Sequence, residues 1–293
     1  MIQKRNLFEE LKHQVQNGTM TNRLIIINVA VFALIHILFA IAQFSGVSGI
    51  GQLIDQLFTL NASIEGVLYM PWGLLTSIFA HFDIWHIFSN MIFLYFAGNL
   101  FERYFNSKML LITYLFGGLI GGLAEIISAT FTTEIHKVLG ASGSVMAIIT
   151  ALAFYSPNTK IYLFGTFPVR LFVLALFFLA TDLIGIGNTN DHVAHFAHLG
   201  GALFGLLAMQ NLNTPKNLLS KIDLLWQKGN AWFKKISRPR PKGRKVKTDE
   251  EYNFEKTRKQ EKTDRILDKI SKSGYDSLNK DEKDFLFNQS KNA

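Results

Sequence analysis

Ser142 stands in the sequence Gly140-Ala141-Ser142-Gly143, directly ahead of an apolar run. A serine hydroxyl becomes a nucleophile when a neighbouring base takes its proton. Glycines beside a serine let another segment approach closely, and a backbone N–H at a helix start lacks an intrahelical partner and can donate to a negative oxygen. Such a sequence taken alone is more often only a loosened loop, so the chemistry depends on a base elsewhere in the chain.

A second apolar run supplies the candidate base. His198 lies one turn inside this run, and Gly201 and Gly205 after it form a small-residue surface on which another helix can pack. If that other helix is the one that Ser142 begins, His198 can reach the serine. His195 lies three residues earlier on nearly the same face, so spacing alone does not choose between the two histidines.

A third polar group opens another apolar run. His86 and Asn90 are four residues apart and therefore share one helical face. Both side chains can donate a hydrogen bond to a negative oxygen. The alternative is that they only hold neighbouring helices together, as polar residues often do in membranes. His81 lies nearer the start of the run, where we expect it to organise the preceding loop.

Metal chemistry has weak support in this sequence. The chain has no cysteine, which excludes disulfides, thiolate metal sites and cysteine nucleophiles. There is no HExxH motif, and His81 and His86 are five residues apart, which suits one helical face poorly. His192, His195 and His198 could form a ligand set, but we favour no metal and no cofactor.

These polar groups belong to a chain with the composition of a membrane protein. Its 293 residues are 49% hydrophobic and 18% charged, and charges are scarce between Leu24 and Met209. Because about 20 apolar residues cross a bilayer, six runs predict membrane-spanning helices. The runs are Leu24–Phe44, Trp85–Phe101, Met109–Thr130, Ser142–Tyr155, Val169–Ile186 and His195–Leu212. The fourth is short, so we expect it to begin inside the membrane, shielded by its neighbours.

The basic residues predict how these helices are oriented. Of the 30 Lys and Arg residues, only Lys137 falls on one side of the six-helix topology. The positive-inside rule therefore places both termini in the cytoplasm. The net charge of +8 comes mainly from the C-terminal tail and requires no nucleic-acid partner. The loop of about residues 45–80 has no Lys or Arg, and we expect it to lie at the outer membrane interface.

The predicted organisation has four parts. Residues 1–23 are a cytoplasmic N-terminal segment, 24–212 a six-helix domain, 213–250 a basic linker and 251–293 a small helical region. In the last part, Asn279 and Glu282 have the spacing of a capping box, which predicts a helix start.

Three motifs together resemble the rhomboid intramembrane serine proteases, of the bacterial type. They are His81-xxxx-His86-xxx-Asn90, Gly140-Ala141-Ser142-Gly143 and Ala197-His198-x-x-Gly201. The resemblance covers about Asn22 to Leu212, including the number and order of the spans, and implies an all-α bundle of six membrane helices. The distal tail resembles a small accessory domain found on some bacterial rhomboids.

The resemblance also implies roles for individual residues. It makes Ser142 the nucleophile and His198 the general base of a Ser–His dyad that has no catalytic carboxylate. His86, Asn90 and the Ser142 N–H would form the oxyanion hole. His195 does not fit the motif, because His198 stands where the motif has glycine. In several relatives an aromatic ring packs on the base from the position that Met146 occupies here, and the Trp-Arg pair of some relatives is absent from the first long loop.

The implied function is endoproteolysis of membrane-spanning proteins in or near their spans, in a bacterial inner membrane and without a cofactor. The dyad is expected in a water-filled pocket, and removal of everything after about Lys216 should leave proteolysis intact. Two alternatives belong to other classes. One is an inactive rhomboid-like protein that holds client helices, against which the intact Ser142 and His198 argue. The other is a transporter that uses the buried histidines, Glu125 and Asp182.

Overall fold

The computed structural model describes residues 6–46, 49–131, 137–163, 166–186, 188, 193–236 and 248–290. The chain divides into two compact units, Met1–Ala231 and Trp232–Ala293, which are described separately.

Six apolar helices lie at the six predicted runs. Among the described residues, three of them are long and apolar enough to cross a membrane: α2 (Met20–Ser45), α6 (Ile84–Tyr104) and α7 (Ser107–Ala129). Three are shorter: α8 (Ser142–Tyr155), α9 (Leu171–Gly185) and α10 (His195–Met209). The prediction of a mostly helical membrane bundle is therefore confirmed. The fifth run was placed too early, because residues up to Arg170 form a strand, and the sixth ends at Met209 rather than Leu212.

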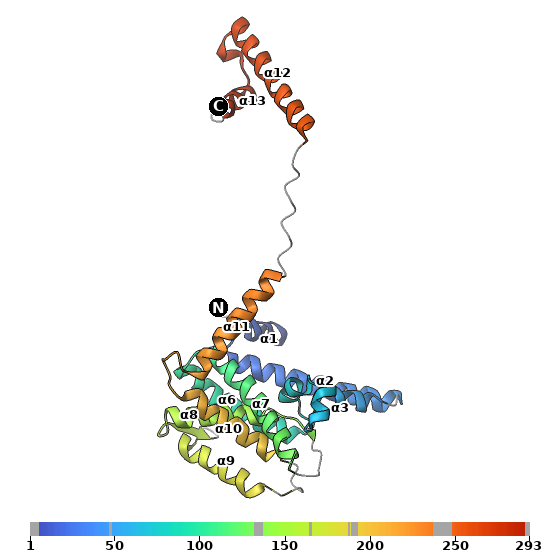
Figure 1. Ribbon diagram of the computed structural model, residues 1–293, viewed down its shortest axis with the longest axis vertical. Coiled ribbons are helices and arrows are strands. Elements are labelled where there is room, and N and C mark those ends of the chain that lie inside the picture. Colours follow the sequence, from blue (N-terminus) through green and yellow to red (C-terminus); the bar gives the residue numbers. More distant parts are fainter. Residues whose placement is uncertain are drawn as a thin grey trace. The chain divides into compact units, whose positions relative to one another are not determined.

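Helix α8 is the centre of the first unit. It packs against α6, α7, α9 and α10 (Figure 1). Every residue from Gly143 to Ala153 is buried. At about 1.5 Å per residue, a helix of 14 residues is shorter than the ~30 Å hydrocarbon core. The expectation that neighbouring helices enclose the short fourth run agrees with this burial.

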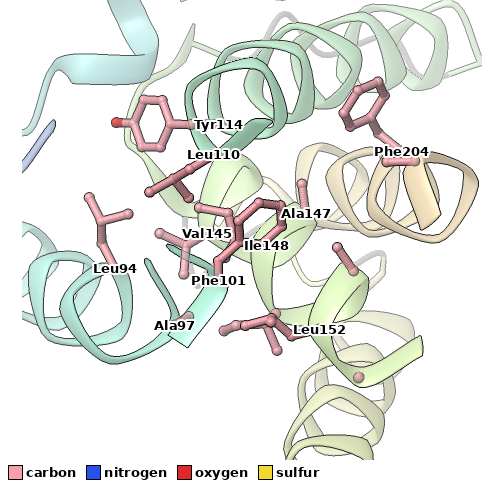
Figure 2. Packing of buried hydrophobic residues seen from close by; sticks show 14 of the residues in the cluster. Leu94, Ala97, Phe101, Leu110, Tyr114, Val145, Ala147, Ile148, Leu152 and Phe204 are labelled. Carbon is pink, nitrogen blue, oxygen red and sulfur yellow. The ribbon is translucent and has the colours of Figure 1, made fainter. Parts of the chain in front are cut away.

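The core is built from the faces of these helices that meet α8. Figure 2 shows its apolar side chains packing together. They include Leu94, Ala97 and Phe101 of α6, Leu110 and Tyr114 of α7, Val145, Ala147, Ile148 and Leu152 of α8, and Phe204 of α10. Helix α2 stands at the edge of this core, and it joins α7 where the Asn28 amide donates to the Tyr114 hydroxyl at 2.9 Å. Most of α2 is left exposed, as suits a lipid-facing helix.

The structure also contains short strands, which the expectation of an all-α fold does not include. β1 (Leu60–Asn61) pairs with β2 (Lys137–Val138), and β3 (Lys160–Leu163) pairs with β4 (Phe167–Arg170), both antiparallel. Strands of two to four residues carry too little alternation to be seen in a sequence. The β1–β2 pair, together with an ion pair between Asp55 and Lys137, ties the first long loop to the segment that leads to Ser142.

That loop consists mainly of short helices. These are α3 (Ile50–Phe58), α4 (Ile64–Tyr69), α5 (Gly73–Thr76) and the 3₁₀ turn η1 (Ser77–Phe79). At the N-terminus, α1 (Leu7–Asn17) forms within the segment predicted only as cytoplasmic chain, and Asn6 caps it.

Helix α11 (Leu218–Ile236) corrects the prediction that residues 213–250 are a linker. Its first turn belongs to the membrane unit, since Leu219 is buried in the main core. Asn217 just before it donates from its amide to the carbonyl oxygens of Ala208 and Gln210, both at 2.8 Å. The first turn of α11 is therefore packed in the membrane unit, just beyond the end of α10.

The second unit contains α12 (Asp249–Ser273), the 3₁₀ turn η2 (Tyr275–Ser277) and α13 (Lys280–Ser290). The predicted capping box is confirmed: the Glu282 N–H donates to Asn279 Oδ1 at 2.9 Å and the Asn279 N–H donates to Glu282 Oε2 at 2.8 Å. Lys269 of α12 also donates to Glu282, and this hydrogen bond lowers the pKa of the Glu282 carboxyl. The two helices are thus joined at the start of α13.

Truncation tests where the membrane unit ends. A chain cut after Lys216 loses Asn217 and Leu219, so we expect its free energy of unfolding to fall by about 2 kcal/mol or more. A chain cut after Ile236 keeps both residues and should melt like the full-length protein. Thermal unfolding of the three proteins in one detergent measures this. Equal melting temperatures for both truncations would contradict the placement of α11 in the membrane unit.

Candidate active site

Ser142 is the first residue of α8, and the turn before it is held in place from two sides. The Gly140 N–H donates to the Ser77 carbonyl at 2.9 Å, and the Ala141 N–H donates to His81 Nε2 at 3.3 Å. Gly140 has a φ of +124°, and a Cβ there would lie 2.7 Å from the His86 ring. Only glycine satisfies both the backbone and the space at this position. The local geometry therefore fixes the direction in which α8 starts.

Backbone-to-backbone packing brings α10 onto α8. A Cβ on Gly201 would overlap the carbonyl oxygen of Gly143, and one on Gly205 would overlap that of Ala147. The small-residue surface of α10 thus faces the helix that Ser142 begins. A Cβ on Gly121 of α7 would overlap the carbonyl oxygen of Ala197, so α7 also packs closely against the first turn of α10.

The start of α10 is fixed by a carboxylate from another helix. Among the described residues, the N-cap Ala194 offers no capping side chain, and the Ala197 N–H donates instead to Glu125 Oε2 of α7 at 3.0 Å. A negative group at a helix N-terminus is favoured by the helix dipole. Glu125 therefore anchors the turn that carries His198.

These contacts place His198 beside Ser142. His198 Nε2 lies 2.7 Å from Ser142 Oγ, which is hydrogen-bonding distance for proton transfer. Both side chains line a cavity of about 860 Å³. Met146, one turn after Ser142, is buried and lines the same cavity.

The other ring nitrogen of His198 meets a carboxylate. Its Nδ1 lies 2.7 Å from Asp182 Oδ1 of α9, and His195 Nδ1 lies 2.9 Å from the same oxygen. The resemblance implied a dyad without a carboxylate, whereas this structure brings one to the histidine. The sequence marked Asp182 only as an ionisable residue inside an apolar run, and it held no signal that α9 packs this residue onto α10.

His86 and Asn90 line the same cavity as Ser142. The Asn90 amide donates to the His86 carbonyl at 3.0 Å, and its nitrogen lies 3.3 Å from His81 Nε2. A side-chain amide nitrogen carries two N–H groups. Both contacts are made by this nitrogen, which is the atom that would have to donate to an oxyanion. His81 is fully buried and contacts both Asn90 and Ala141, which places it at the turn before Ser142.

A metal-ligand set was also considered from the sequence. Among the described residues, Asp182, His195 and His198 have ligand-type atoms within 4.8 Å of one another. His192, the third histidine of the sequence-based set, lies outside the described residues. In the structure, Nδ1 of His195 and of His198 is directed at the carboxylate.

The contact between α8 and α10 predicts the effect of a single methyl group. Gly201→Ala must push α10 away from Gly143, so we expect a loss of about 2 kcal/mol in the free energy of unfolding. Gly229→Ala is the matched control, because Gly229 lies in exposed α11 with nothing near a new Cβ. It should be neutral or stabilising by up to about 1 kcal/mol. Thermal unfolding in detergent measures both, and a neutral Gly201→Ala would contradict the packing described.

Two segments of the chain match families of known proteins. Residues 69–212 match the rhomboid domain, which includes Ser142 and His198. Residues 247–292 match a family of unknown function, DUF6576, and this segment contains α12 and α13.

Curated relatives carry rhomboid names. RHOMBOID-like protein 12, mitochondrial, of Arabidopsis thaliana is 33% identical over 182 residues, which are 56% of this chain and 54% of the relative. The human presenilin-associated rhomboid-like protein, mitochondrial, is 29% identical over 153 residues, or 51% of this chain and 39% of the relative. The chain thus spans about half or less of the length of these relatives. Their mitochondrial names give no support to the expected bacterial membrane. This mostly helical membrane protein is thus similar to rhomboid proteins over residues 69–212.

Proposed function

We propose that this protein is an intramembrane serine endopeptidase that cleaves membrane-spanning proteins in or near their spans. The observation that carries the proposal is the 2.7 Å contact between Ser142 Oγ and His198 Nε2 on the wall of a cavity of about 860 Å³. The match to the rhomboid domain and the identity with rhomboid-like proteins support the same class.

In this mechanism Ser142 is the nucleophile and His198 the general base. Ser142 Oγ attacks the scissile carbonyl while its proton passes to His198 Nε2. The protonated imidazole then gives this proton to the leaving amine, which leaves an acyl group on Ser142. Water activated by the same nitrogen releases the acyl group. The reaction uses the side chains present and needs no cofactor.

The negative oxygen of the tetrahedral intermediate would lie among three donors. The Ser142 N–H is at the start of α8, where a helix leaves N–H groups without intrahelical partners. His86 and Asn90 line the same cavity from α6. For Asn90 to take part, its amide must turn from the His86 carbonyl.

The orientation and the location are part of the proposal. The distribution of Lys and Arg favours both termini on the cytoplasmic side. A bacterial inner membrane stays a prediction from the sequence.

The two alternatives predict different behaviour. An inactive client-binding protein would share the fold but would not cleave. In a transporter, Glu125 and Asp182 would serve a moving ion or proton, but here Glu125 holds the start of α10 and Asp182 Oδ1 lies within 2.9 Å of two histidine rings. These pairings favour the peptidase over the transporter.

Cleavage of a single-helix membrane substrate in liposomes tests the dyad. We expect Ser142→Ala and His198→Ala each to abolish cleavage and their effects to be non-additive, because the two residues act as one unit. His195→Ala should keep most of the activity. Ser144→Ala is the matched control for the serine, since Ser144 is buried two residues further along α8. Full activity in His198→Ala would overturn the assignment.

Steady-state kinetics test the oxyanion hole. Losing one of several oxyanion donors should cost about 2 kcal/mol of transition-state stabilisation, so we expect Asn90→Ala to lower kcat by about ten- to a hundredfold with KM nearly unchanged. Melting temperatures on the same preparations separate catalysis from packing. A normal kcat with a lowered melting temperature would mean that Asn90 only holds α6 in place.

A further inference from the structure

Asp182 is a buried carboxylate with two imidazole partners. Only 4% of its surface is exposed, and one oxygen, Oδ1, faces Nδ1 of His198 at 2.7 Å and Nδ1 of His195 at 2.9 Å. A carboxylate removed from water is costly unless its oxygens are paired. The same His198 ring faces Ser142 through its other nitrogen at 2.7 Å. Ser142, His198 and Asp182 thus form one continuous chain across α8, α10 and α9.

We propose that Asp182 is a positioning residue that holds His198 with its proton on Nδ1 and leaves Nε2 bare toward Ser142. This inference rests on the proposed serine peptidase function and adds a third member to its machinery. The sequence resemblance implied a site that works without this residue.

The chemistry of the three groups requires this arrangement. An ionised carboxylate only accepts hydrogen bonds, so a neutral histidine bonded to it through Nδ1 must carry its proton there. Nε2 then has a lone pair for the Ser142 proton. When Ser142 attacks, that proton moves to Nε2, and the positive charge of the imidazolium lies next to Asp182. No proton leaves Nδ1, and the carboxylate stays ionised throughout.

The rival explanation is that Asp182 only ties α9 to α10 through His195. His195 is packed on α9, since a Cβ on Gly185 would overlap its ring. That contact does not involve His198, whose Nδ1 lies 2.7 Å from the same carboxylate oxygen. The titratable groups that face His198 are Asp182 and His195 on one side and His86 of α6 on the other. Among these, Asp182 supplies the negative charge.

The tautomer of His198 can be measured directly in the wild-type protein. Histidine labelled with ¹⁵N gives different shifts for a protonated and a bare ring nitrogen, and His198→Gln identifies the signals of His198 by difference. We expect protonated Nδ1 and bare Nε2 in the neutral state. Protonated Nε2 with bare Nδ1 would overturn the proposal. This measurement does not depend on cleavage, so it separates failure of the positioning role from failure of the peptidase function.

Matched carboxylate-to-amide changes supply the kinetic test. In Asp182→Asn the neutral amide cannot stabilise the imidazolium and can hold the wrong tautomer, so we expect kcat to fall by about a hundredfold or more, with KM changed less than about threefold. Glu102→Gln makes the same change in a carboxylate of α6 that accepts from the Thr21 N–H of α2 at 3.0 Å and is not among the described residues that line the cavity. We expect it to keep kcat within about threefold.

The melting temperature of each variant is measured on the same preparation. An Asp182→Asn protein with normal kcat per folded molecule would contradict the proposal and leave Asp182 as a tie between helices. If Asp182→Asn does not fold, the tautomer of the wild-type His198 decides the question, because a carboxylate that ties the helices only through His195 sets no requirement on the proton of His198.

Discussion

The close approach of α8 and α10 is the constraint on which the rest of the site depends. Gly201 lies against the Gly143 carbonyl and Gly205 against that of Ala147, so the two backbones meet without side chains between them. Lipid tails are as apolar as the helices, so the hydrophobic effect does not drive helices together in a membrane. Small residues let two helix backbones approach closely and pack tightly. The contact sets Ser142 and His198 at 2.7 Å although 56 positions separate them in the chain.

Several polar groups around this contact have partners on other elements. Glu125 accepts from the first turn of α10, Asp182 Oδ1 lies within 2.9 Å of two histidine rings, and His81 accepts from the turn before Ser142. Buried polar groups in membrane helices cost free energy when they lack partners. Here the partners come from different helices, so satisfying them also fixes the helices against one another.

Much of this could be predicted from the sequence, because the signals are local. Long apolar runs give the helices, and the spacing around Ser142, His198, His86 and Asn90 points to one chemistry. The strands β1–β4 are too short to show a period in the sequence. The basic residues of α11 favour a linker, because only a few apolar residues among them pack on the core. The place of Asp182 depends on how α9 packs on α10. No spacing in one chain reveals that packing.

Site mapping of a covalent probe shows whether the fold makes Ser142 a nucleophile. The protein in liposomes is treated with a fluorophosphonate, digested and examined by mass spectrometry, beside a sample unfolded before treatment. We expect one adduct in the folded sample, on Ser142, and none in the unfolded one, because the reactivity comes from His198 held at 2.7 Å. Labelling of several serines, or equal labelling of Ser142 before and after unfolding, would contradict it.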